Sequence, residues 1–280
     1  MIYIVTPVFN RIKFTENFLK ALEKQTVKNF RTIIVDDGST DGTSEMIEKH
    51  FPDVIILKES GDLWWAEATN IGVKYAIKAG ADYVMTLNDD TLPNNDYIEM
   101  MIYWSKKMPN ALLGALALDH KTNKIIFGGN NISFKNRTIT PVINNLSEAE
   151  KHGLHEVNFF PGRGLLIPIN VFKEIGYYDS KNFPQTVADL DFTHRAVRAG
   201  YKIFCNYDAK IKMYEEASSN TYLKRNKSVK NFILHLFSKK GGGNLLWFIK
   251  YAFKNCPKKH LFLFLLRGIF GRTVGYWIRD

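Results

Sequence analysis

The sequence predicts an α/β protein built on a mostly parallel sheet. Apolar, β-branched runs at residues 2–9, 31–35 and 83–87 are typical of buried parallel strands. Between the first two runs, apolar side chains recur at helical spacing over residues 14–22. This alternation of strand and helix is the pattern of a parallel sheet with helices on both faces.

The other elements continue this alternation. A glycine-containing turn after the second strand leads into a short helix at residues 44–50 and a third strand at 54–57. A loop at 61–65 precedes a helix at 66–79, which Gly80 ends. In the second half we expect strands at residues 112–118, 125–128, 202–206 and 210–214, a helix at 188–199 and a polar loop region at 130–158.

The composition is that of a protein with a substantial core, since 45% of the 280 residues are hydrophobic. Cys205 and Cys256 show no zinc-binding or disulfide spacing, which favours a reducing compartment. Residues 1–9 lack the basic start of a signal peptide. The longest apolar run, residues 261–266, is far shorter than the ~20 residues of a spanning helix. We therefore expect a cytoplasmic protein.

The net charge of +10 is unevenly distributed along the chain. Residues 224–280 hold thirteen Lys and Arg against one acidic residue, whereas residues 1–223 hold twenty-five against twenty-seven. The whole basic excess therefore lies in the last fifth of the chain. This asymmetry predicts two functional parts, residues 1–223 and 224–280.

Acidic residues follow two of the predicted strands. Asp36 and Asp37 end one, and the triplet Asn88, Asp89 and Asp90 ends another. Open α/β sheets bind ligands at the carboxyl ends of their strands, and carboxylate oxygens are ligands for Mg²⁺ or Mn²⁺. An Asp-rich turn without a ligand is the simpler alternative.

Six segments together resemble the family 2 glycosyltransferases with the GT-A nucleotide-sugar fold. They lie in the family's order, and the resemblance runs from about residue 2 to residue 214. Three departures stand out: Thr69 where Arg is frequent, Asn88 in place of the first Asp of an Asp-x-Asp motif, and no His in the segment 213–216 after the last strand. The matching segments are residues 6–10, 36–41, 68–72, 88–90, 176–179 and 188–196.

The resemblance implies a metal-dependent, inverting glycosyltransferase. The donor would be a UDP- or dTDP-sugar, with Mg²⁺ or Mn²⁺ neutralising the leaving diphosphate. The acceptor would be a saccharide or a lipid-linked saccharide in bacterial surface polysaccharide synthesis. Residues 1–223 would then form the GT-A catalytic domain.

The resemblance also implies roles for the donor-side residues. Asp37 would accept the uracil or thymine N3–H, with the backbone of Pro7 and Val8 against the base and ribose. Asp90 would bind the metal, and Asp89 the metal or the donor ribose. The alternative for Asp36 and Asp37 is that they only cap a turn before a helix. To replace the missing His, Glu215 is a candidate metal ligand and Tyr214 a candidate phosphate contact.

The loop at residues 61–65 is similar to that of relatives that transfer deoxyhexoses such as rhamnose. Trp64 and Trp65 offer a sugar flat apolar faces, and Asp62 can accept hydrogen bonds from its hydroxyls. These residues would contact the donor sugar, although one Trp is also a candidate for core packing.

The acceptor side is assigned to a second set of residues. By position, Asp189 would be the general base, with capping of its helix as the alternative or additional role. Asp191 would orient the loop or bind the acceptor. Arg163 faces an acceptor or phosphate, or lies on the surface. His194 is interpreted as a helix-face residue.

Residues 224–280 interleave their thirteen cations with eleven aromatic side chains. A cationic amphipathic helix with aromatics is typical of an anionic membrane surface. The enzyme would then lie at the inner face of the cell membrane, close to a lipid-linked acceptor. Alternatively this region covers the core or mediates homo-oligomerisation. Nucleic-acid binding is a poorer explanation, because no recognised nucleic-acid motif accompanies the charge.

Two other classes of protein compete with this interpretation. A nucleotidyltransferase on a similar sheet usually has a glycine-rich basic loop after the first strand, which residues 7–12 lack. A non-catalytic saccharide-binding or membrane-scaffold protein is motivated by Asn88 and the missing His.

Overall fold

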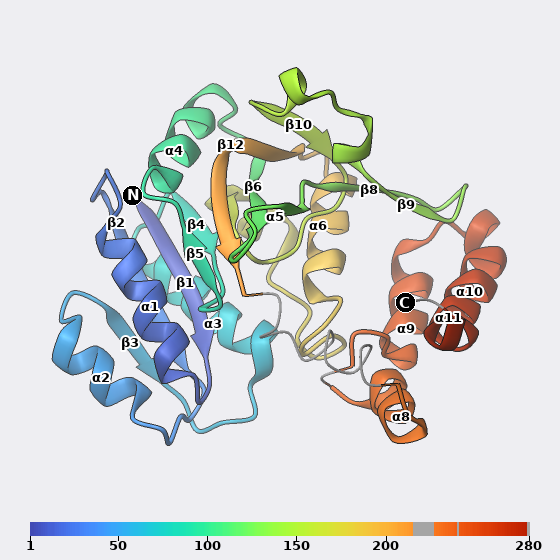
Figure 1. The fold of residues 1–280 in the computed structure, drawn as a ribbon, viewed down its shortest axis with the longest axis horizontal. Helices are drawn as coiled ribbons and strands as arrows, with labels where there is room; N and C mark the ends of the chain where they lie inside the picture. Colours follow the sequence, from blue (N-terminus) through green and yellow to red (C-terminus); the bar gives the residue numbers. More distant parts are fainter. Residues whose placement is uncertain (215–226, 240, 279–280) are drawn as a thin grey trace.

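The protein is described from a computed structural model that covers residues 1–214, 227–239 and 241–278. A ten-stranded sheet forms its centre, and a group of helices from the end of the chain lies beside it (Figure 1). The predicted α/β class with a C-terminal helical region is confirmed. The sheet strands are β1 (Ile2–Val8), β2 (Phe30–Asp36), β3 (Ile55–Lys58), β4 (Tyr83–Thr86), β5 (Thr91–Pro93), β6 (Leu112–Asp119), β7 (Ile125–Phe127), β10 (Leu154–Val157), β11 (Leu165–Pro168) and β12 (Ile203–Met213).

A two-stranded hairpin and the helices complete the described chain. The hairpin pairs β8 (Asn130–Ser133) with β9 (Thr138–Pro141), and two short 3₁₀ turns, η1 (Val142–Asn145) and η2 (Glu148–Glu150), follow it. The helices are α1 (Ile12–Glu23), α2 (Thr43–His50), α3 (Trp64–Lys78), α4 (Tyr97–Lys107), α5 (Ile169–Ile175), α6 (Ala188–Arg198), α8 (Val229–Phe237), α9 (Leu245–Asn255), α10 (Lys258–Arg272) and α11 (Val274–Ile278).

The ten strands of the sheet run in two directions, because β5, β7, β10 and β11 are antiparallel to the other six. The order along the sheet is β10-β12-β6-β11-β4-β1-β2-β3, with β1 parallel to both β2 and β4, and β2 parallel to β3. Strand β11 runs antiparallel to β4 and β6, so β6 and its parallel partner β12 point the same way as β4. The carboxyl ends of β1, β2, β4, β6 and β12 therefore share one edge of the sheet.

Two hydrophobic layers cover the faces of the sheet. One joins Val73 of α3 and Phe192 of α6 to the strands, and the other joins Phe18 of α1 and Met101 of α4. Helix α3 comes very close to the sheet at Gly72, where an added Cβ would lie 2.4 Å from Val5 Cγ1. The alternating apolar pattern of the sequence reflects these two layers.

Several element boundaries differ from the sequence prediction. The region at 130–158 contains the β8–β9 hairpin and β10 rather than a loop, because Asn side chains bond its backbone: the Ile132 N–H donates to Asn158 Oδ1 at 2.7 Å. Helix α3 begins at Trp64, inside the predicted loop. The strands predicted at 202–206 and 210–214 are one strand, β12, with a register shift between Asn206 and Lys210. The sequence prediction did not contain β5, α4, β11 or α5.

The C-terminal helices lie against α6, on the side of the molecule opposite α1 and α2 (Figure 1). Trp247 and Tyr251 of α9 belong to the same apolar layer as Phe192 of α6. Within the described parts of the chain, every helix is too short or too polar to cross a membrane. The C-terminal region is thus packed onto the sheet domain.

Candidate functional site

The site is built where β2, β1 and β4 end side by side. The turn after β1 is tied to the turn after β2, because the Asn10 N–H donates to Ser39 Oγ at 2.9 Å and the Thr40 N–H donates to Asn10 Oδ1 at 2.7 Å. The Asp37 N–H donates to the Val8 carbonyl at 3.0 Å. These bonds fix the positions of the predicted nucleotide residues Pro7, Val8 and Asp37 relative to one another.

Asp36 and Asp37 have different roles in the fold. Asp36 is buried and accepts hydrogen bonds from the Ser39 N–H at 2.8 Å and from the Ser44 hydroxyl. Asp37 accepts from the backbone N–H groups of Leu63 and Trp64 at 3.1–3.2 Å. Asp36 therefore stabilises its own turn, whereas Asp37 anchors the start of α3, a helix distant in sequence.

The start of α3 carries the residues predicted to contact the donor sugar. Asp62 and Trp64 both have positive φ values, 68° and 61°, and Asp62 is exposed. Trp65 is held on several sides: its indole N–H donates to Asn88 Oδ1 at 2.9 Å, and its ring packs edge-on against Tyr178. Trp65 therefore takes part in core packing and also fixes the amide of Asn88, the residue that departs from the Asp-x-Asp pattern.

The carboxylates of Asp89 and Asp90 share one guanidinium. Arg11 Nη1 lies 3.2 Å from Asp89 Oδ1, and Arg11 Nη2 lies 3.2 Å from Asp90 Oδ2. Asp89 is 1% exposed and also accepts from Thr15 Oγ1 at 3.1 Å. Burial raises the pKa of Asp89 to about 7, with the charge of Arg11 opposing the shift and that of Asp90 adding to it.

Few of the described side chains at this site can act as metal ligands. The described residues hold no cluster of three or more His, Cys, Asp or Glu suited to a metal. However, Asp90 Oδ1 is buried and has no hydrogen-bond partner. A single free carboxylate oxygen fits Mg²⁺, which commonly takes one or two protein carboxylates together with substrate phosphates. Glu215, the predicted additional ligand, lies outside the described residues.

Asp189 lies at the first turn of α6. Its carboxylate accepts hydrogen bonds from the Gly162 N–H at 3.3 Å and from the Leu190 N–H at 2.8 Å. Asp189 is therefore held both by its own helix and by a loop that is distant in sequence. The residue before the helix, Val187, has φ 74°, a conformation that β-branched residues rarely adopt. Burial raises the pKa of Asp189, while these backbone bonds and the charge of Arg163 oppose the shift.

Arg163 connects the two acidic parts of the site. Burial lowers the pKa of its guanidinium, and the charges of Asp90 and Asp189 oppose that shift, so both carboxylates act on it. Its Nε atom is buried without a hydrogen-bond partner. A buried donor without a hydrogen-bond partner is suited to an anionic or hydroxyl-bearing ligand.

Asp191 is directed toward the C-terminal helices. It is fully buried and bonded to Arg195 Nε at 2.9 Å, Lys254 Nζ at 2.9 Å and Asn255 Nδ2 at 3.0 Å. His194 lies next to it and is bonded through Nδ1 to the Tyr251 hydroxyl. The structure therefore separates Asp191 from Asp189, as their spacing on a helix requires.

Arg11 and His120 were not identified from the sequence. The His120 ring lies 4.3 Å from that of Tyr214, and the Tyr214 N–H donates to the Asp90 carbonyl at 3.2 Å. Arg11 follows β1 and His120 follows β6, and the carboxyl ends of both strands lie at the site edge. Their positions just after predicted strands could have indicated both residues from the sequence. Arg11 directly contacts predicted site residues.

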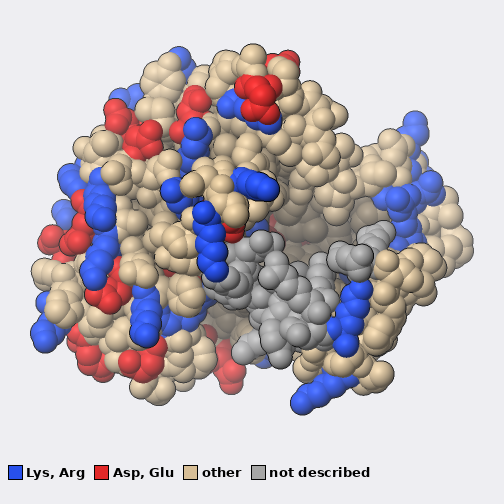
Figure 2. Space-filling model, in the orientation of Figure 1, with Lys and Arg blue, Asp and Glu red and all other residues tan. Residues whose placement is uncertain are grey.

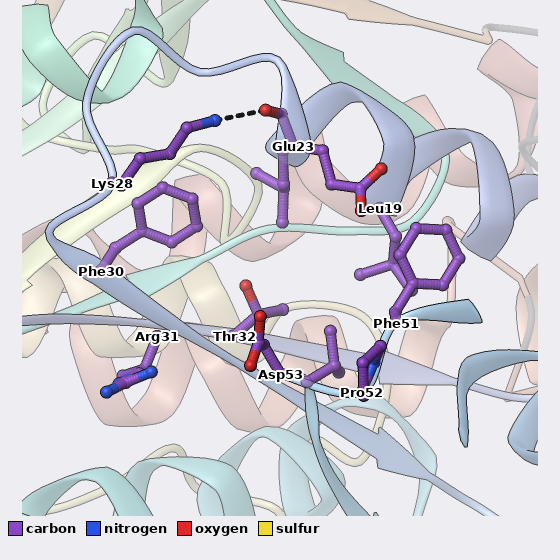
Figure 3. A pocket seen from close by; sticks show the side chains of 11 residues that line it. Leu19, Glu23, Lys28, Phe30, Arg31, Thr32, Phe51, Pro52 and Asp53 are labelled. Carbon is purple, nitrogen blue, oxygen red and sulfur yellow. Dashed lines mark hydrogen bonds between the residues drawn. The ribbon is translucent and has the colours of Figure 1, made fainter. Parts of the chain in front are cut away.

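One described hollow with a defined lining lies elsewhere. A cavity of about 460 Å³ opens at the amino end of β2, between Leu19, Phe30 and Phe51 (Figure 3). None of the predicted site residues lines it. The cavity is at the opposite edge of the sheet from the acidic site.

Comparison with known proteins agrees with this geometry. The sequence profile of "Glycosyl transferase family 2" matches residues 3–159. An uncharacterized glycosyltransferase of Rickettsia conorii is 34% identical over 127 residues, which are 44% of this chain and 20% of the relative. The O-antigen chain rhamnosyltransferase RfbN of Salmonella typhimurium is 23% identical over 204 residues, 72% of this chain and 62% of the relative.

The relatives are longer than this chain, and the solved structures are similar to it in fold. The chain spans 14–20% of the length of three Rickettsia relatives. A solved structure of GalNAc-T7 with UDP, GalNAc and Mn²⁺ superposes with a TM-score of 0.64 at 14% identity, over 98% of this chain and 57% of that one. That likeness confirms the predicted GT-A fold.

Proposed function

Because the chain belongs to glycosyltransferase family 2, and so is a glycosyltransferase, we propose that it moves a sugar from a UDP- or dTDP-sugar to a saccharide or lipid-linked acceptor with inversion. The observation that carries this proposal is the loop 162–164, because its Gly162 N–H donates to Asp189 Oδ2 at 3.3 Å and its Gly164 N–H donates to the carbonyl of Thr86, at the end of β4, at 2.8 Å. One loop thus joins the candidate base to the strand that leads to the donor-side carboxylates, as a transfer reaction between two substrates requires.

The nucleotide would bind over the ends of β1 and β2. Asp37 accepts two backbone bonds from the start of α3, and its oxygens retain lone pairs for a base N3–H. The backbone of Pro7 and Val8 lies beside it across the β1–β2 pairing. We assign Asp37, Pro7 and Val8 to the base and ribose.

The diphosphate would lie at the acidic pair. Asp90 has the free oxygen that suits Mg²⁺ or Mn²⁺, an ion that would supply charge neutralisation to the leaving group when bound. Asp89 is nearly fully buried, so its effect on the donor ribose or diphosphate passes through the groups that it holds in place. Asp62, Trp64 and Trp65 would border the donor sugar at the start of α3.

The acceptor hydroxyl would lose its proton to Asp189. A general base must be ionised and held in one orientation; the Gly162 and Leu190 N–H groups fix the orientation and favour the ionised form against the effect of burial. Arg163 would bind the acceptor or a phosphate. We propose that Asp191 acts indirectly, by fixing α6 to the C-terminal helices rather than by touching the acceptor.

The C-terminal helices would bring the enzyme to an anionic membrane surface at the inner face of the cell membrane. Phe262, Leu266 and Phe270 recur every four residues along α10 and are 71%, 51% and 55% exposed. Exposed Lys258, Lys259 and Arg267 lie on the same helix, and Figure 2 shows Lys and Arg gathered over the C-terminal helices. An apolar stripe with flanking cations suits a lipid interface.

A donor panel tests the proposed activity. Hydrolysis and transfer would be measured with UDP- and dTDP-sugars, including dTDP-rhamnose because of the similarity to RfbN, with and without Mn²⁺. We expect one nucleotide sugar to be turned over in a Mn²⁺-dependent manner. If no nucleotide sugar binds or reacts, the proposed donor class is wrong.

A further inference from the structure

Arg11 is held at the centre of the donor side. It is the last residue before α1, and the turn that carries it is fixed from the neighbouring strand end, because the Ile12 N–H donates to Asp41 Oδ2 at 3.0 Å. The Thr15 N–H donates to the Arg11 carbonyl at 3.0 Å, which ties the residue to the first turn of the helix. The backbone of Arg11 is therefore fixed between the Asp37 turn and the acidic pair.

The Arg11 guanidinium occupies the acidic pair. It bridges Asp89 and Asp90 at 3.2 Å each, and its central carbon lies 4.8 Å from the centre of the Phe14 ring. Its side chain is 30% exposed, whereas those of Asp89 and Asp90 are 2% and 15% exposed. Arg11 is therefore the most exposed side chain of this ion cluster, and its Nη2 atom, although buried, makes no hydrogen bond that would hold it to Asp90.

We propose that Arg11 binds the donor diphosphate and competes with the divalent ion for Asp90. In the free protein the guanidinium pairs with both carboxylates and offsets part of their negative charge. When nucleotide and metal bind, the metal takes Asp90 and the guanidinium moves to the diphosphate. This inference deepens the proposed function and depends on it for the identity of the diphosphate.

The physical basis is charge balance and geometry. Two cations near the same carboxylates repel each other, so the divalent ion binds weakly while the guanidinium stays. A diphosphate brings its own negative charge, and a guanidinium forks onto phosphate oxygens as well as onto carboxylates. Arg163, on which the charge of Asp90 also acts and whose buried Nε has no hydrogen-bond partner, adds a second cation to the site. Metal binding is therefore expected to depend on the nucleotide.

Mn²⁺ titration of the nucleotide-free protein tests the competition. Free Mn²⁺ would be followed by electron paramagnetic resonance for the full chain, Arg11→Gln and Lys13→Gln. Lys13 is exposed and two residues away, so its change removes the same charge from the same turn without touching the acidic pair. We expect Arg11→Gln to bind Mn²⁺ about five- to tenfold more tightly than wild type, and Lys13→Gln to match wild type.

Nucleotide titration tests the contact with diphosphate. With Mg²⁺ present, calorimetry would compare UDP with UMP, and dTDP with dTMP. We expect Arg11→Gln to weaken the binding of the diphosphates by about tenfold and the binding of the monophosphates far less. Arg11→Lys should have an intermediate affinity for the diphosphates. Circular dichroism and melting curves check that each variant is folded.

The outcomes separate this inference from the proposed function. If Arg11→Gln binds Mn²⁺ no more tightly than wild type, including the case in which neither binds it, the competition is disproved. Equal losses of affinity for the diphosphates and the monophosphates would show that Arg11 does not bind the diphosphate. If wild type binds no nucleotide at all, the proposed donor class fails, while the Mn²⁺ comparison still decides whether Arg11 competes with the metal.

Discussion

Lys254 of α9 places its ammonium group 2.9 Å from the buried carboxylate of Asp191 on α6. The same ammonium lies 2.7 Å from Asp179, in the segment that leads to α6. One lysine of the basic region thus connects to two acidic residues of the sheet domain, close to the candidate base Asp189. We therefore propose that the region after residue 223 folds as part of the catalytic unit instead of forming a detachable appendage.

Replacing Lys254 is expected to weaken this connection. Lys254→Met leaves Asp191 buried with Arg195 and Asn255 as its remaining partners. We expect the free energy of unfolding to fall by roughly 1–3 kcal/mol, less than for an isolated buried pair because those partners remain. Urea denaturation measures the change, and Lys258→Met, at an exposed position on α10, is the control. Equal stability of both variants would show that the bridge contributes nothing.

Replacing Asp189 tests the general base. Asp189→Asn keeps the shape of the side chain and its acceptance of the Gly162 N–H but removes proton abstraction. We expect transfer to fall by about 10²–10⁴ while the donor Kd stays unchanged. Asp53→Asn, at the opposite edge of the sheet, should retain full activity. Comparable transfer by Asp189→Asn would exclude this residue as the base.

The pH dependence of transfer gives a second test of Asp189. The base acts in its ionised form, and burial raises the pKa of this carboxyl above its usual range. The rate should therefore fall as the pH drops through the raised pKa, at a higher pH than for an exposed aspartate. A kcat profile measured at saturating donor reports this value. A rate that stays flat down to the usual Asp range would contradict the assignment.

The sequence predicted that Asp36, Asp37, Asp89 and Asp90 lie at strand ends because each pair follows an apolar run, whereas Asp189 was assigned from the resemblance alone. It did not predict which of them meet. Arg11 reaches Asp89 and Asp90 only because β1 and β4 are neighbours in the sheet, and Trp65 reaches Asn88 only because α3 starts early. Similarly, the β8–β9 hairpin was missed because side-chain bonds from Asn158, distant in sequence, stabilise it in place of an apolar pattern.

His194 should make the stability of the protein sensitive to acid. Burial lowers the pKa of His194 to about 4, with Arg198 adding to the shift and Asp191 opposing it. The unfolded chain, with an ordinary His pKa near ~6.5, binds this proton more readily than the native state. The contribution of neutral His194 is thus complete above about pH 6.5 and is lost as the pH falls toward about 4.

The acid sensitivity can be measured by comparing variants. The free energy of unfolding in urea would be measured at pH 5 and pH 7.5 for wild type and His194→Gln. The difference between the two pH values should be larger for wild type, by on the order of 1–2 kcal/mol. His260→Gln, on the less buried helix α10, serves as the matched control and should behave like wild type. If His194→Gln keeps the wild-type slope, another group causes the acid sensitivity.

The exposed stripe of α10 makes the membrane proposal testable without truncating the chain. Truncation would uncover the buried side of α6, so substitutions are the cleaner experiment. Phe262→Ser with Phe270→Ser removes two side chains that are 71% and 55% exposed and leaves the packed faces intact. Because each buried aromatic contributes about 1.5–3 kcal/mol of apolar transfer, the pair should reduce vesicle binding at least about tenfold.

Co-sedimentation with phosphatidylserine-containing vesicles measures that loss. Tyr75→Ser with Tyr103→Ser is the control, since these exposed aromatics, 39% and 47% exposed, lie on helices α3 and α4 of the sheet domain. The control should bind like wild type, and raised salt should weaken wild-type binding because the cations of α10 are screened. Unchanged binding by the α10 variant would mean that another surface meets the membrane. Concentration-dependent assembly of wild type without vesicles, abolished by the same substitutions, would instead identify the stripe as a homo-oligomer contact.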